Sequence, residues 1–109
     1  MDNYFGLRES DLQTIIAILQ QENEIEEAII FGSRAKGNYK NGSDVDIVLK
    51  GEKVNHQLIN QISYLLNEET LMPYKFDVLD YNTVSNKHLV EHIDRAGKTF
   101  WKKNTQTFY

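Results

Sequence analysis

The sequence predicts a small α/β domain in which a mixed sheet of three to four strands is packed with helices. Short apolar runs indicate buried strands, and amphipathic stretches between them indicate helices. The chain has 109 residues, which suits one domain with one modest core. We therefore expect a single domain over 1–109, with a loosely ordered tail at about 102–109.

Local signals indicate where the elements begin and end. Ser10 has the capping-box spacing of a helix start, while Gly37 and Gly97 are candidate helix C-caps. Pro73 bars continuation of the helix before it. The expected elements are a helix at about 10–21, a strand at 28–31, a helical turn at 33–36, a strand at 44–49, a helix at 55–68, a strand at 76–79, a helix at 86–96 and a short edge strand at 99–101.

Composition restricts the class of protein. Hydrophobic residues make up 40% and charged residues 26%, which is typical of a globular domain. The absence of cysteine excludes disulfides, thiolate zinc sites and cysteine nucleophiles. A net charge of −4 counts against stable nucleic-acid binding, which usually needs a basic face. No signal peptide and no apolar run of about 20 residues is visible, so a cytoplasmic protein without membrane association is expected.

Three aspartates form a candidate metal site. Asp44 and Asp46 are two positions apart on an expected strand, so their side chains share one face, with Cα atoms about 6.5–7 Å apart. Such carboxylates repel each other unless a cation lies between them. Asp77, between Phe76 and Val78, is expected to be buried and to complete the site. Mg²⁺ suits these oxygen ligands, and a pair of ions could serve an in-line displacement in which Asp77 helps accept a proton.

A glycine-serine turn ends the first expected strand, ten residues before these acids. Gly32 permits close approach of the backbone to a ligand, and the following turn and the Ser33 hydroxyl can hold phosphate. Arg34 is expected to reach the β- and γ-phosphates, while Lys36 and Lys40 are interpreted as solvated charges. The turn and the acids together indicate metal-dependent nucleotidyl transfer.

The remaining polar and aromatic residues receive structural interpretations. Asp80 is expected to be a turn acid that faces away from Asp77, three positions earlier. His88 and His92 are four apart on an expected helix and are interpreted as a surface pair rather than a zinc site, because no third ligand is evident. Phe100, together with Trp101, is interpreted as a core or partner-facing anchor.

The segments 30–37 and 43–48 resemble the signature of the polymerase-β-like nucleotidyltransferase superfamily. The resemblance covers about 15–101, and the small size, the strand at 76–80 and the closing helix are similar to the minimal nucleotidyltransferase branch, the MntA-type antitoxins. Only 63 residues follow Asp46, too few for the large helical substrate domain of many relatives.

This resemblance implies a function and a partner. MntA-type proteins transfer AMP from ATP to a tyrosine of a HEPN-domain ribonuclease toxin and so neutralise it. Carried onto this chain, the resemblance makes Gly32, Ser33 and Arg34 triphosphate-binding residues. It makes Asp44, Asp46 and Asp77 the ligands of Mg²⁺, two ions in all.

The residues by themselves leave the nucleotide and the acceptor open, and three hypotheses stand. The first is the AMP-transferring antitoxin. The second is a nucleotidyltransferase that acts on a small molecule or an RNA end, with a separate chain binding the substrate. The third is a masking antitoxin without catalysis, which would use Phe100, Trp101 and Phe108 as an interface. Three clustered acids are costly to retain, which favours catalysis.

Overall fold

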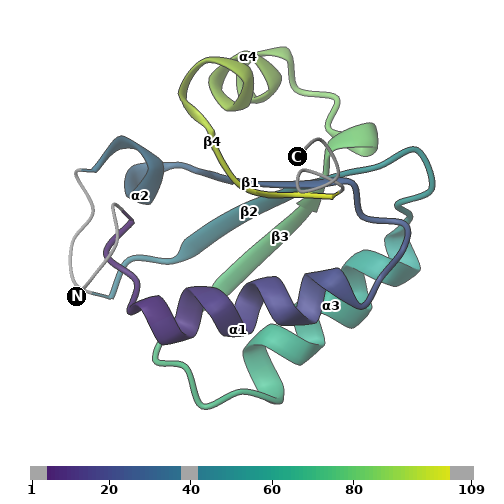
Figure 1. Ribbon diagram of the computed structural model, residues 1–109. Helices are drawn as coiled ribbons and strands as arrows, with labels where there is room; N and C mark the ends of the chain where they lie inside the picture. Colours follow the sequence, from purple (N-terminus) through teal and green to yellow (C-terminus); the bar gives the residue numbers. More distant parts are fainter. Residues whose placement is uncertain (1–4, 38–41, 104–109) are drawn as a thin grey trace, which may run out of the picture.

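The protein folds around a mixed four-stranded sheet, seen in a computed structural model that describes residues 5–37 and 42–103. The strand order is β3-β2-β1-β4 (Figure 1). β1 (Glu27–Phe31) pairs antiparallel with both β2 (Val45–Lys50) and β4 (Lys98–Lys102), and β2 pairs parallel with β3 (Phe76–Asp80). The predicted fold class is confirmed, with β4 as the expected edge strand.

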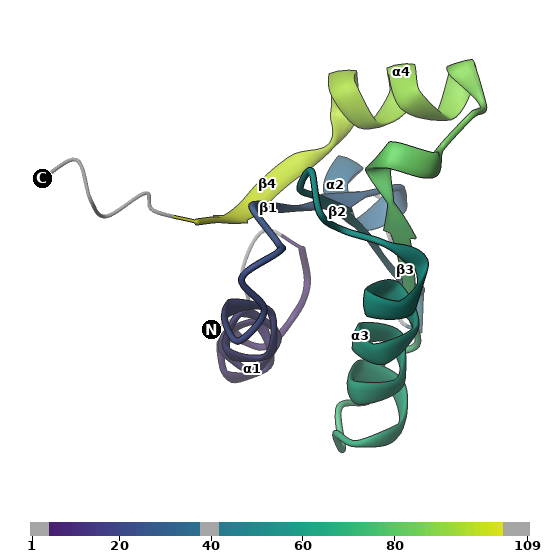
Figure 2. The ribbon, with the colours of Figure 1, turned by 90° about the vertical axis from the view of Figure 1, so that its right-hand side faces the viewer.

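Helices cover both faces of this sheet. Figure 2 shows α1 and α3 together on one side and α4 on the other. A one-turn helix, α2, follows β1, and a 3₁₀ turn, η1, follows β3. The helical elements are α1 (Glu9–Gln20), α2 (Ser33–Lys36), α3 (His56–Glu68), η1 (Tyr81–Thr83) and α4 (Lys87–Ala96).

Alternation along the strands divides the apolar side chains into two cores. The main core fills the space between the sheet and α1 and α3, and the strands contribute Ala28, Ile30, Val45, Ile47, Leu49, Phe76 and Val78 to it. The second core is much smaller, because only Ile29, Phe31, Val48 and Ile93 are buried in it. α4 is therefore held by few apolar side chains, and part of the sheet face on its side is left for polar groups.

One predicted helix start differs from the structure, and one predicted helix end is confirmed. α1 begins at Glu9, so Ser10 is not its N-cap. Arg8 occupies the N-cap position instead, and Asp11 is buried, with its Oδ2 accepting from Nε of Arg8 at 3.0 Å. Gly97 ends α4 in extended backbone rather than a left-handed cap, although a Cβ there would collide with the carbonyl oxygen of Ile93. Glycine is thus required at this position by close packing, not by its φ angle.

The C-terminal expectations are confirmed in part. β4 extends to Lys102, which pairs with Glu27, so the predicted loose tail begins too early in the sequence. Phe100 and Trp101 are partly buried and pack against the main core. Residues 104–109, which include Phe108, lie outside the described residues, as does Lys40. Among the helices of the described segments, none is both long and apolar enough to cross a membrane.

Candidate active site

Strand register places two of the predicted acids side by side. Asp46 of β2 is the partner of Asp77 in the parallel β2–β3 pair, and of Phe31 in the antiparallel β1–β2 pair. Their neighbours Ile47 and Val78 belong to the main core, so the two aspartates lie on the opposite face, on the α4 side of the sheet. Residues 31 positions apart in sequence thus meet in one row across three strands.

Asp44, the third predicted acid, directly precedes β2. The strand begins at Val45, so the prediction that Asp44 is its first residue is wrong by one position, and Asp44 is exposed. Partial burial raises the pKa of Asp46, and the negative charges of Asp77 and Asp44 raise it further. The three carboxylates are therefore close enough to interact electrostatically, as their sequence pattern predicts.

Asp77 is exposed, which contradicts the expectation that it is buried. The apolar neighbours that suggested burial, Phe76 and Val78, point to the main core from the other face of β3. β3 is an edge strand, and the small core beneath α4 leaves this end of its outer face uncovered. The exposed carboxylate is accessible to a molecule that approaches from solvent.

Gly32 connects the glycine-serine turn directly to Asp46. It precedes α2 with φ 76° and ψ −154°, a conformation that is essentially restricted to glycine. A Cβ at this position would lie 2.5 Å from Oδ2 of Asp46. The Asp46 carboxylate therefore packs against the backbone from which α2 starts, and Ser33 is the first residue of that helix. The expected end of the turn at Gly37 is confirmed by its left-handed backbone, with φ 82°.

Arg34 differs most from its predicted role. Its side chain is buried, with 3% of the residue exposed, and its guanidinium points into the protein. NH1 donates to the carbonyl oxygen of Phe5 at 2.9 Å, while Nε and NH2 donate to that of Ser43 at 3.2 and 2.9 Å. The guanidinium carbon also lies 5.3 Å from the ring centroid of Tyr74. This geometry contradicts the prediction that Arg34 reaches the phosphates, because its donors are occupied by main-chain oxygens.

The other candidate ligands lie apart from the three acids. Asp80 is buried on the face opposite Asp77, as its offset of three positions predicts, and it caps η1. His88 is exposed, but His92 is only partly so and its ring packs edge-on against Phe31 with centroids 6.4 Å apart. The interpretation as a surface pair therefore holds for His88 and is wrong for His92. Sequence spacing gave no signal of this contact.

The chemistry of the three acids fits a hard divalent cation. Mg²⁺ binds oxygen ligands and usually takes one or two carboxylates, with water and substrate phosphates filling the other positions. No lysine or arginine among the described residues forms an ion pair with Asp44, Asp46 or Asp77, so their charge has no basic partner there. Within the described ranges, no three acidic or histidine side chains stand ready to hold an ion together. Phosphate oxygens and water would therefore complete the coordination that these acids begin.

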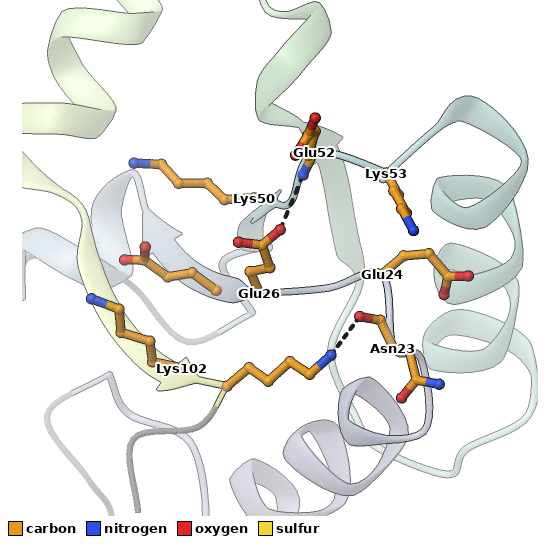
Figure 3. Close-up of a pocket in the computed structure, with 9 residues that line it drawn as sticks. Asn23, Glu24, Glu26, Lys50, Glu52, Lys53 and Lys102 are labelled. Carbon is orange, nitrogen blue, oxygen red and sulfur yellow. Dashed lines mark hydrogen bonds between the residues drawn. The ribbon is translucent and has the colours of Figure 1, made fainter. Parts of the chain in front are cut away.

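A cavity of about 490 Å³ opens at the other end of the sheet (Figure 3). Glu27 and Lys50 are paired at this end of β1 and β2, whereas Phe31 and Asp46 are paired at the site. Side chains of both signs line the cavity: Glu24, Glu26, Glu27, Glu52, Lys50, Lys53, Lys102 and Lys103, with Asn23. Nζ of Lys103 donates to the carbonyl oxygen of Asn23 at 2.8 Å. Because its charges balance, this cavity does not resemble the acidic site.

Fold and site together define a small α/β enzyme of the class that transfers groups from nucleotides. The family model for polymerase β nucleotidyltransferases matches residues 13–106, and the chain belongs to that family. It is a nucleotidyltransferase. A search of curated protein sequences finds no match.

Solved structures show the same fold. One similar chain comes from a toxin–antitoxin complex with AMP-PNP, with a TM-score of 0.70 and 18% identity over 87% of this chain and 76% of that one. Another comes from a tri-AMPylated HEPN toxin of Shewanella oneidensis in complex with an MNT antitoxin (TM-score 0.66, 16% identity, 92% and 76% covered). A third comes from Sulfolobus solfataricus and is provisionally described as a nucleotidyltransferase (TM-score 0.58, 24% identity, 88% and 81% covered).

Proposed function

We propose that this chain is a Mg²⁺-dependent protein adenylyltransferase, the antitoxin that transfers AMP from ATP to a tyrosine of a HEPN-domain toxin. The observation that carries the proposal is the row in which Asp46 and Asp77 are register partners, with Gly32 packed against the Asp46 carboxylate. The shared fold with chains of complexes that contain AMP-PNP or an AMPylated HEPN toxin supports this choice of nucleotide and acceptor.

The triphosphate binds, in this proposal, where α2 begins. The backbone N–H groups of the first helical turn have no intrahelical partners and can donate to phosphate oxygens, as can the Ser33 hydroxyl. Asp44 and Asp46 hold Mg²⁺, which supplies charge neutralisation at the phosphates during an in-line displacement. Asp77 is the third ligand, on the side from which the acceptor arrives.

The chemical step forms one bond and breaks one. The tyrosine oxygen attacks the α-phosphorus, and the bond from that phosphorus to the oxygen bridging the α- and β-phosphates breaks, so pyrophosphate leaves. Asp77 accepts the tyrosine proton, and it can do so because its carboxylate is exposed on an edge strand. The product is an AMP-tyrosine phosphodiester on the partner protein.

Intact mass spectrometry tests the proposal. A HEPN-domain protein encoded next to this chain is incubated with the chain, ATP and Mg²⁺. We expect one or more AMP-sized additions to the partner, which Asp44→Asn and Asp77→Asn should abolish. Asp80→Asn is the matched control, because it makes the same chemical change on the same strand but on the opposite face, where asparagine still caps η1.

Two results would redirect the assignment. An unchanged partner mass beside a stable complex would favour masking without catalysis. Labelled RNA or a small hydroxyl compound that gains a nucleotide while the protein does not would favour the second hypothesis.

A further inference from the structure

We infer that Arg34 is a positioning residue for metal binding: its buried guanidinium fixes the backbone at Ser43 and so sets Asp44 beside Asp46. The inference rests on the proposed function, because it takes Asp44 and Asp46 as the residues that hold the metal ion.

The guanidinium makes a bifurcated clamp on one carbonyl. Nε and NH2 both donate to the Ser43 oxygen, at 3.2 and 2.9 Å, from a side chain that is 3% exposed. A buried cationic donor with neutral acceptors is costly to desolvate, so it strongly favours the conformation in which every donor is used. Ser43 is the residue directly before Asp44, so fixing its carbonyl restricts the peptide plane from which Asp44 extends.

The clamp is needed because Asp44 lacks the support that Asp46 has. Asp46 lies inside β2 and is held by pairing on both sides, with β1 and with β3. Asp44 precedes the strand and is exposed, and the first described residue before Ser43 is Gly42, with φ 85°. The bonds from Arg34 to the Ser43 oxygen restrain the chain before Asp44, and the bond from the Val45 N–H to the carbonyl oxygen of Lys75 at 2.8 Å restrains it after Asp44.

Arg34 is itself held by further contacts inside the protein. NH1 bonds the carbonyl oxygen of Phe5, and the guanidinium lies over the ring of Tyr74. The Tyr74 hydroxyl donates to Oδ2 of Asp11 at 2.9 Å. Arg34 also belongs to α2, which follows Gly32 directly, so its side chain links the glycine-serine turn to the backbone before Asp44.

The arginine fork is what makes this possible. A guanidinium presents several N–H groups in one plane and can serve two carbonyls at once, whereas a lysine ammonium on a flexible stem cannot reproduce that geometry. Arg34→Lys therefore keeps the charge and removes the clamp. Tyr74→Phe is the matched control: it loses the bond to Asp11 and the bond from the Arg8 N–H, yet keeps the ring beneath the guanidinium and the bonds to Ser43.

The test measures the binding of Mn²⁺ alone to the purified full chain, with electron paramagnetic resonance reporting the concentration of the free ion. We expect Arg34→Lys to weaken Mn²⁺ binding by about 10-fold or more, the range found when groups that orient metal ligands are removed. Tyr74→Phe should leave Mn²⁺ binding unchanged even where thermal unfolding shows a comparable loss of stability. ATP binding in EDTA should be the same in wild type and Arg34→Lys.

The opposite results would overturn the inference. Unchanged Mn²⁺ binding in Arg34→Lys would refute positioning, and weakened ATP binding in EDTA would show a phosphate contact instead. A wild-type chain that binds ATP in EDTA but no Mn²⁺ would refute the metal site, and the inference with it. If Arg34→Lys binds Mn²⁺ as tightly as wild type does, and wild type transfers AMP, the positioning role is refuted and the proposed function stands.

A second measurement applies if Arg34→Lys does not fold. Hydrogen exchange of wild type at residues 42–46 should show protection without metal that Mn²⁺ hardly changes, because the clamp orders this segment beforehand. Protection that arises only on addition of Mn²⁺ would overturn the inference.

Discussion

Replacing Gly32 with alanine should damage both stability and catalysis, for two separable reasons. The position has φ 76° and ψ −154°, where a residue with a side chain is strained by about 1–3 kcal/mol. The added Cβ would also lie 2.5 Å from Oδ2 of Asp46, whereas ordinary contact begins at 3.4 Å. The carboxylate, or the backbone that carries α2, must therefore retreat by about 0.9 Å.

These two effects give different readouts. The strain alone should lower Tm by about 4–24 °C, from about 4–8 °C per kcal/mol in a domain of this size. A displacement near 1 Å at a group that positions the reaction costs about 100-fold in rate. The assays are thermal unfolding by circular dichroism and initial rates of AMP addition measured by intact mass spectrometry, at a temperature well below the Tm of the variant.

Gly42→Ala is the control that separates strain from collision. Gly42 also has positive φ, at 85°, but among the described residues a Cβ there would meet no atom within 4 Å. We expect this variant to lose about 1–2 kcal/mol and to keep most of its transfer rate at permissive temperature. The reasoning is refuted if Gly32→Ala is no slower in AMP transfer than Gly42→Ala once both are folded.

Two further changes test the charge of the site and the attachment of α4. Asp77→Asn removes repulsion from its register partner Asp46. Without metal this substitution should therefore raise Tm by about 1–8 °C. The rate of AMP transfer should fall by about 100-fold or more. A lower Tm in differential scanning calorimetry would contradict this account. Ile93→Ala deletes the one fully buried side chain that α4 places in the small core and should cost about 2–5 kcal/mol in urea unfolding. A loss below 1 kcal/mol would show that α4 is held by other contacts.

Spacing between neighbouring residues was enough to predict the fold class and the local chemistry of the acids. Strand alternation is a property of neighbouring residues, so the separation of Asp80 from Asp77 could be read from spacing alone. The start of α4 is also a local property. Asn86 caps it at the expected boundary, because its side chain accepts hydrogen bonds from the N–H groups of His88 and Leu89.

Which of these groups meet depends on contacts between segments that are distant in the sequence. Register between β2 and β3 is a long-range pairing, and it alone makes Asp46 and Asp77 partners. The exposure of Asp77 follows from its place on an edge strand, which apolar neighbours in the sequence could not reveal. The contact between Gly32 and Asp46 likewise joins two strands.

Arg34 shows the physical reason most clearly. In the sequence, an arginine after a glycine-serine turn indicates a phosphate ligand, because charge and proximity are all that spacing conveys. In the structure, the carbonyls of Phe5 and Ser43 lie within reach of its guanidinium and bind it inside the protein. Local sequence determines what a side chain can donate, and the distant backbone that folding brings to it determines what it binds.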